Sequence, residues 1–172
     1  MPTRSQIEGW DTTHLDEAAA RWRQLAARSE ELFEWHRQNV AAPGGTEWSG
    51  DAGDAALDRA TTDAAVVRKQ GDIQREAANI AEDGSRDITL AVGQVLEAVA
   101  AAEADGFEVG EDLSIRDTHR IGVSIIAVRY TASQEHAEDI RWHAERLMQT
   151  DIYLSQRLQG KAFELDALRF DS

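Results

Sequence analysis

The sequence predicts an all-α fold: an elongated helical bundle built on a long antiparallel helical hairpin, followed by a third long helical region. Proline occurs only at positions 2 and 43, so no residue of that kind breaks a helix after position 43. Apolar residues recur at helical steps of three and four over long stretches, whereas the alternation typical of strands is weak. We expect residues 1–172 to form a single helical domain, because this length fits one ordinary domain.

The first helix of the predicted hairpin begins at Thr12 or Thr13 and runs to about Val40. A threonine hydroxyl can cap the helix, and Asp16 in the first turn suits the positive end of the helix dipole. The expected core stripe is Leu15, Ala18, Trp22, Leu25, Ser29, Leu32 and His36, widened on one side by Ala19, Ala26, Phe33 and Val40. Such a stripe requires a partner helix that packs nearly parallel or antiparallel to it.

A short segment at 43–51 is expected to reverse the chain. Pro43 and the two glycines after it stop the first helix, and Thr46 or Ser49 can cap the next one. The segment contains a Trp-x-Gly turn, in which the indole of Trp48 can fold over the end of the hairpin. Gly50 is expected to let a neighbouring backbone approach closely.

The second helical region follows Trp48 and continues to about Asp105, so the predicted hairpin spans 13–105. The first half of its stripe consists of alanine and glycine, which allow another helix to approach closely. Gly84, between Asp83 and Ser85, marks the expected break or bend, because glycine costs about 1 kcal/mol relative to alanine inside a helix.

An acidic loop is expected at 105–117 and a third helical region at 118–170. The loop allows a short extended piece, and its apolar residues are expected to pin it onto the end of the bundle; they are Phe107, Val109, Leu113 and Ile115. The third helix should start near Asp117 or Thr118, and Gly160 should end or bend it. Helical spacing then continues to the end of the chain.

Composition excludes several classes of function. With 32 acidic and 18 basic residues, the formal charge is -14, and no basic patch is segregated, so no nucleic-acid partner is expected. The chain has no cysteine, which excludes disulfides and thiolate metal sites. The first ten residues lack the apolar region of a signal peptide, and no apolar run approaches the ~20 residues of a membrane span.

No catalytic or cofactor motif is present, so we expect no enzyme activity, no cofactor and no metal. A glycine-rich phosphate loop and a Gly-x-Ser-x-Gly elbow are both missing. The Glu-x-x-His pattern of di-iron bundles fails at His36, His136 and His143. A weaker alternative is a surface metal site, because His136, Asp139 and His143 fall on adjoining turns of one helical face.

The capped first helix, the turn Trp48-Ser49-Gly50 and the alanine-rich second helix resemble the WxG-type helical hairpins exported by actinobacterial type VII (ESX) secretion systems. The opening Gly9-Trp10-Asp11-Thr12-Thr13-His14-Leu15 resembles the start of larger proteins of this kind. Single-chain substrates, in which a second pair of helices packs on the first, are the closer comparison. The resemblance covers 10–105 in sequence features and 118–170 in architecture.

The resemblance implies a type VII secretion substrate, or the secretion-targeting N-terminal domain of one, that acts by protein–protein recognition through Trp48 and Gly50. The implied partners are the secretion machinery and either a small helical WxG-type protein or a second copy. The protein would be made in the cytoplasm and secreted, or displayed at the cell surface, without a cleavable signal peptide. The family also uses a Tyr-x-x-x-Asp/Glu signal, but Gln134 follows Tyr130 and Arg157 follows Tyr153 at that spacing.

Two other tryptophans are candidate recognition residues. Trp22 is expected in the core, whereas Trp35 and Trp142 lie off the main stripes. They either pack against a third helix or form an interface with a second subunit, since tryptophan is enriched at binding hot spots. The alternative function is a cytoplasmic coiled-coil-like scaffold or assembly protein with no export role. Opening to bind lipid is disfavoured by the charge of -14 and the lack of a basic polar face.

Overall fold

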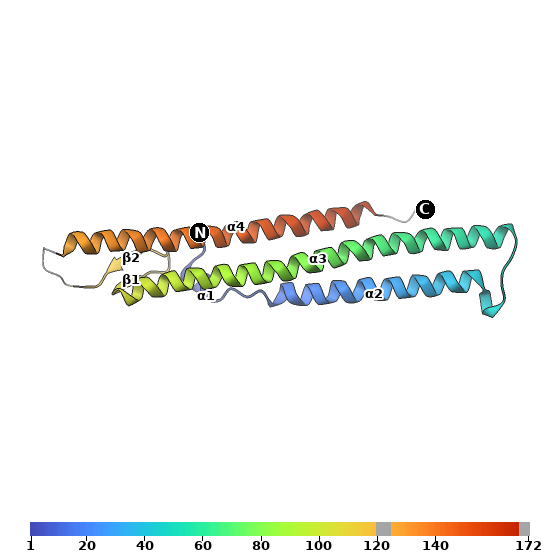
Figure 1. The fold of residues 1–172 in the computed structure, drawn as a ribbon, viewed down its shortest axis with the longest axis horizontal. Coiled ribbons are helices and arrows are strands. Elements are labelled where there is room, and N and C mark those ends of the chain that lie inside the picture. The colour runs from blue at the N-terminus through green and yellow to red at the C-terminus, as the bar shows by residue number, and fades with distance from the viewer. Residues whose placement is uncertain (120–124, 169–172) are drawn as a thin grey trace. The chain divides into compact units, whose positions relative to one another are not determined.

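The computed structural model describes residues 1–119 and 125–168, and most of them are helical (Figure 1). The elements in chain order are α1 (Arg4–Glu8), α2 (Thr13–Ala41), the 3-10 helix η1 (Pro43–Gly45), α3 (Asp51–Ala104), β1 (Phe107–Val109), β2 (Ile115–Asp117) and α4 (Ile126–Ala167). The prediction of a mainly helical chain is confirmed, with one short pair of strands in addition. None of these helices, within the described ranges, is long and apolar enough to cross a membrane.

The contacts divide the chain into two compact units. The first unit combines residues 1–13 with 83–155, and the second combines residues 14–82 with the chain from Gln156 onward. Both α3 and α4 therefore contribute one part to each unit. The division falls within helices, because each of these long helices meets different partners along its length.

In the second unit, α2 and the first part of α3 run antiparallel. Arg23 near the start of α2 binds Glu82 and Asn79, whereas Glu30, further along, binds Arg75. Residues later in α2 thus contact residues earlier in α3, as expected of an antiparallel pair. The Arg75 guanidinium donates to both Glu30 oxygens, at 2.7 and 2.8 Å, which is the strong bidentate geometry of an arginine–carboxylate pair.

The buried face of α2 differs in part from the predicted stripe. Leu15, Ala19 and Ala26 are buried, but Leu25 and Leu32 are 52% and 56% exposed. The buried face thus includes Ala19 and Ala26, which were expected only at the side of the core stripe. The sequence offers two adjacent apolar stripes with helical spacing, and the one with small alanines packs closely against the alanine-rich face of α3.

Two glycines expected to break, end or bend helices lie inside continuous helices, so Gly84 does not break α3 and Gly160 does not end α4. A Cβ at Gly84 would meet the Leu154 side chain of α4, so this glycine allows close packing within the first unit instead of a bend. A Cβ at Gly160 would meet nothing within 4 Å, and α4 continues to Ala167. The helix tolerates both glycines, because the cost of each is small compared with the packing along a long helix.

The first unit contains an N-terminal element that the sequence analysis did not predict. Helix α1 starts at a capping box, in which the Thr3 side chain and backbone bond reciprocally with Gln6. Ile7 is fully buried. Further along, Thr12 accepts a 2.8 Å hydrogen bond from the buried hydroxyl of Ser85 on α3. The N-terminal segment is therefore fastened along the second part of α3.

The acidic loop forms a short β-hairpin, so the predicted extended piece is confirmed. β1 and β2 pair antiparallel, with Phe107 opposite Asp117. Phe107, Val109 and Leu113 are buried and Ile115 is half-buried, as expected of residues that pin the loop. The predicted helix start near Asp117 or Thr118 was wrong, because Asp117 belongs to β2 and α4 begins at Ile126. The predicted helical residues 120–124 and 169–170 lie outside the described residues.

Candidate functional site

The predicted recognition turn lies between α2 and α3, in the second unit. Trp48 is 45% exposed, and its backbone N–H donates to the carbonyl of Ala41 at the end of α2, at 3.2 Å. Its indole borders a shallow surface depression of about 390 Å³, which Pro43, Thr46 and Glu47 also line. The turn therefore presents an anchored backbone and an accessible aromatic ring.

The glycines of the turn have roles other than those predicted. Gly50 has a φ of +108°, a conformation that disfavours other residues, but a Cβ there would meet nothing within 4 Å. The expectation that Gly50 permits close backbone approach was therefore wrong. That role belongs to Gly53 in α3, where a Cβ would lie 2.8 Å from the Trp48 carbonyl oxygen and 3.2 Å from indole carbons.

The predicted caps of the second helix were also wrong. The backbone N–H of Thr46 donates to the carbonyl of Pro43 and so closes the short helix η1. Helix α3 begins at Asp51, and the carbonyl of Gly50 accepts its first hydrogen bond, from Asp54 at 2.9 Å. Two acidic residues in this first turn, Asp51 and Asp54, suit the positive end of the helix dipole.

The other predicted recognition residues are exposed but do not all belong to one unit. Trp35 lies on α2 in the second unit and is 65% exposed, whereas Trp142 lies on α4 in the first unit and is 53% exposed. The Arg146 guanidinium stacks on the Trp142 ring, 4.8 Å from its centroid, and the His143 ring meets it edge-on. Trp22, expected in the core, is half-buried.

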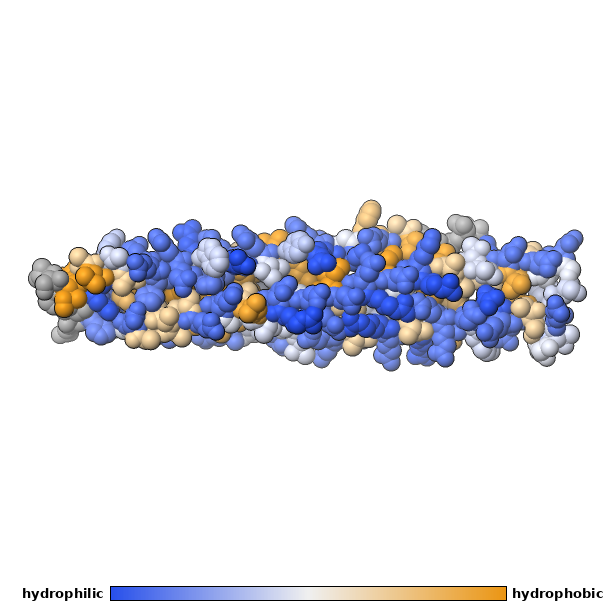
Figure 2. Space-filling view, viewed as in Figure 1, coloured by the Kyte–Doolittle hydropathy of each residue, from blue (hydrophilic) through white to orange (hydrophobic). Residues whose placement is uncertain are grey.

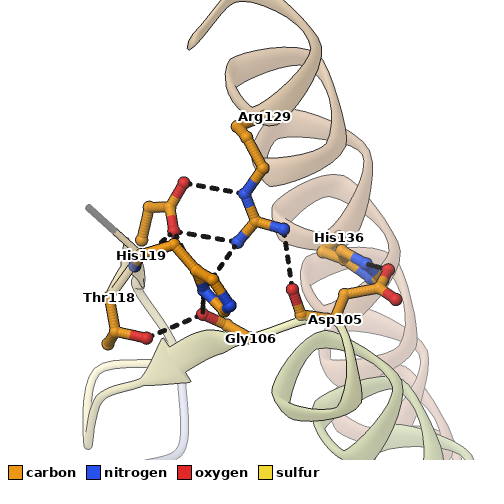
Figure 3. A network of polar contacts seen from close by, with 7 residues as sticks. Asp105, Gly106, Thr118, His119, Arg129 and His136 are labelled. Atoms are coloured by element: carbon orange, nitrogen blue, oxygen red, sulfur yellow. Dashed lines mark hydrogen bonds and ion pairs between the residues drawn. The ribbon is translucent and has the colours of Figure 1, made fainter. Parts of the chain in front are cut away.

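A polar cluster that the sequence analysis missed joins the β-hairpin to α4 (Figure 3). The Arg129 guanidinium donates to both carboxylate oxygens of Asp117, at 2.8 and 3.0 Å, and to the backbone carbonyl of Asp105, at 2.8 Å. It also lies 4.2 Å from the centroid of the buried Phe107 ring, a cation–π geometry. One arginine thus fastens the end of α3 and both strands.

Two histidines extend this cluster. The Nδ1 of His119 lies 3.1 Å from the Gly106 carbonyl oxygen and 3.4 Å from the Arg129 guanidinium, so it bonds the carbonyl only in the tautomer that carries a proton on Nδ1. A Cβ at Gly106 would collide with the His119 ring, and its φ of +82° also favours glycine. His136 Nε2 lies 2.6 Å from a carboxylate oxygen of Asp105.

The electrostatics of the cluster centre on Asp117. Hydrogen bonds from the Arg129 guanidinium, reinforced by the backbone N–H of His119, lower the pKa of the Asp117 carboxyl to about 2. The hydrogen bond to the Asp117 carboxylate in turn raises the pKa of Arg129. Both groups therefore stay charged over the whole physiological range.

The contacts of this cluster hold the β-hairpin against α4 and the end of α3, which is a structural role. Within residues 1–119 and 125–168, no group of three or more acidic, histidine or cysteine side chains could hold a metal ion. Of the three residues of the weaker metal alternative, His143 and Asp139 lie 3.5 Å apart, whereas His136 faces Asp105. The hydrogen bonds of Arg129 and His136 to Asp117 and Asp105 join residues 12 to 31 positions apart, so no short spacing pattern could have revealed the cluster.

The fold thus defines a mainly helical protein, in which the exposed Trp48 lies between the end of α2 and the start of α3. The chain is 34% identical over 171 residues to the uncharacterized proteins Mb2102c of Mycobacterium bovis and Rv2077c of Mycobacterium tuberculosis. The alignment covers 99% of this chain and 52% of each relative, so the chain spans about half the length of these relatives. No family model and no solved structure matches the chain.

Proposed function

We propose that this chain is a type VII secretion substrate, or the secretion-targeting N-terminal helical domain of one, and that it acts by protein–protein recognition. The observation that carries the proposal is the accessible Trp48 in a tight turn between two long helices that pair antiparallel. This arrangement fits the WxG-type hairpin that the sequence resembles. The mycobacterial origin of the relatives is consistent with an actinobacterial secretion route.

Recognition in this proposal uses the rigidity of the turn. The Trp48 backbone is bound to Ala41, Gly53 leaves room for its carbonyl and indole, and Gly50 takes the left-handed conformation before α3. A fixed indole loses little conformational entropy when a receptor covers it, so a single aromatic residue can contribute strongly to binding. The folded protein would be made in the cytoplasm, presented to the secretion machinery by this turn and exported without a cleavable signal peptide.

Export of Trp48→Ala in a strain with an active type VII system tests the proposal. We expect the variant to accumulate in the cells while the wild type reaches the medium. Phe163→Ala is the matched control, because Phe163 is an exposed aromatic residue on α4 and is 75% accessible. If Trp48→Ala is exported at the wild-type level, the proposal that Trp48 targets the protein for secretion is wrong.

One observation favours the second candidate, a cytoplasmic scaffold or assembly protein. Tyr130 and Tyr153 are exposed on α4, but neither has an acidic residue four positions later, so neither matches the second export signal. In the secretion proposal a partner chain supplies that signal. Cell fractionation separates the two candidates, because a scaffold would stay in the cytoplasm even when the secretion system is active.

A further inference from the structure

An apolar groove in the second unit lies between three helices. It has a volume of about 290 Å³, and every residue that lines it belongs to 14–82 or to the chain from Gln156 onward. The lining residues come from α2, α3 and the last part of α4; they are Trp22, Leu25, Gln74, Ala77, Leu158, Lys161, Ala162 and Leu165. Ala77 is buried whereas Leu25 is 52% exposed, so the groove extends from the helix contact to the surface.

The groove has the size and the lining of a site for one small apolar molecule. Ligand pockets in proteins are typically ~300–1,000 Å³ in volume and mainly apolar, with a few polar groups that orient the ligand. All the described residues that line this groove are apolar except Gln74 and Lys161. Because its volume lies at the lower end of that range, the groove fits a single alkyl chain better than a lipid with two chains.

The charges around the groove favour an uncharged ligand. Among the described lining residues only Lys161 is charged, and its ammonium donates to the carboxylates of Glu76 and Glu164. The hydrogen bonds to Glu76 and Glu164 raise the pKa of Lys161, so the ammonium stays charged. A cationic head group would be repelled by Lys161, and an anionic one would be repelled by the two carboxylates that Lys161 already binds.

The amide of Gln74 indicates which uncharged head group the groove binds. Gln74 is half-buried, and within residues 1–119 and 125–168 its side chain has no hydrogen-bond partner. An amide offers both donors and an acceptor, and a hydroxyl group can do the same. One hydroxyl can therefore accept a hydrogen bond from Gln74 or donate one to it.

We propose that this groove binds a single alkyl chain with an uncharged hydroxyl head group, that is, a fatty alcohol. The chain packs against Trp22, Leu158 and Leu165, and the hydroxyl group bonds the amide of Gln74. Burial of the chain supplies the affinity, and the amide and the charges at the groove select the head group. This inference does not depend on the proposed function, since it concerns none of the residues of the turn at Trp48.

The first experiment titrates the purified protein with 1-decanol, decanoate and decyltrimethylammonium by calorimetry, each below the concentration at which the probe aggregates. The three probes share one alkyl chain and differ in the charge of the head group. We expect saturable binding of 1-decanol with one site, and binding of both ions weaker by about tenfold. Equal affinity for all three probes, or no saturable binding of 1-decanol, would overturn the proposal.

The second experiment fills the groove. Ala162→Phe should abolish binding of 1-decanol, because Ala162 is exposed and lines the groove. Gln159→Phe is the matched control: it adds the same ring at an exposed position of α4 that does not line the groove, and it should bind like the wild type. Circular dichroism checks that both variants keep the wild-type helix content. Wild-type affinity in a folded Ala162→Phe would exclude the groove as the site.

A third variant tests the head group without adding volume to the groove. Gln74→Leu should weaken binding of 1-decanol by about fivefold, the effect of one ordinary hydrogen bond. This variant also decides the matter if Ala162→Phe loses helix content. Unchanged affinity of Gln74→Leu would contradict the bond between the amide and the hydroxyl group.

A membrane is the competing source of alkyl chains. Sedimentation with phosphatidylcholine vesicles tests it, and we expect the wild type to stay in the supernatant, because the groove fits one chain and not a lipid surface. Sedimentation of the protein with the vesicles, together with no binding of 1-decanol, would show a membrane-contact face and contradict the proposal.

Discussion

At the scale of single residues, glycines and one arginine determine the local geometry. Gly53 gives the Trp48 carbonyl its space, and Gly106 gives the His119 ring its space, yet neither role was predicted from the sequence. The reason is physical: the space needed beside a glycine depends on a distant neighbour, which local propensity does not encode. Arg129 was missed for the same reason, because its partners become neighbours only in the folded chain.

Acid should weaken the ion pair between Arg129 and Asp117. The pKa of Asp117 is about 2 in the folded protein, below its usual value of 3.8, so the ion pair stabilises the fold fully above the usual value. That stability is lost as the pH falls from about 4 to about 2. We therefore expect urea unfolding to show the wild type more stable than Asp117→Asn at pH 6, with the difference shrinking toward pH 2.

The control for this measurement is Asp139→Asn, which removes an exposed carboxylate on α4 outside the cluster. Its stability should follow the wild type more closely than that of Asp117→Asn does. A stability difference between wild type and Asp117→Asn that stays constant from pH 6 to pH 2 would contradict the assigned ion pair.

At the scale of elements, helix bounds were predictable where the chain carries its own stop signals. Helix α2 ends at Ala41, two positions before Pro43 and the two glycines that follow it, and α3 covers nearly the predicted range. The short helix α1 was not predictable, because it depends on burial of Ile7. The predicted helix start at Asp117 failed because this residue pairs with Phe107 in the β-hairpin. The buried face of α2 was mispredicted, since two apolar stripes compete on one helix and only packing against α3 selects between them.

Two glycines of α3 provide a matched test of close packing. Gly84→Ala should destabilise the protein by about 1–3 kcal/mol, because the added methyl group meets Leu154. Gly93→Ala should stabilise it by about 0.5–1 kcal/mol, since a Cβ there meets nothing within 4 Å and alanine favours the helix. Chemical denaturation of both variants measures the two effects. Equal effects of the same sign would show that Gly84 has no packing role.

At the scale of the whole molecule, the contacts define two units that share the helices α3 and α4. The turn at Trp48, which we propose is recognised, belongs to the second unit, whereas the Arg129 cluster belongs to the first. The turn proposed to bind a partner and the cluster that binds the β-hairpin therefore belong to different units. Figure 2 shows that polar residues predominate on the visible face and that apolar residues form separate patches, so binding should rely on small apolar surfaces.

Loss of the Arg129 contacts should therefore destabilise only the first unit. In Arg129→Gln, amide hydrogen exchange should become faster in the β-hairpin and at the start of α4, because the contacts to Asp117 and Asp105 are lost. The amides of α2 should exchange at the wild-type rate, since α2 belongs to the second unit. Faster exchange along α2 would show that the two units unfold together.

The central claim is that the indole of Trp48 is the recognised feature, and a graded substitution series at this position tests it most directly. Export of wild type, Trp48→Phe and Trp48→Ala should be measured together, with thermal unfolding of each purified protein as the check on folding. We predict that all three fold with similar stability, because Trp48 is 45% exposed, and that export decreases in that order. Equal export of all three folded proteins would contradict the account.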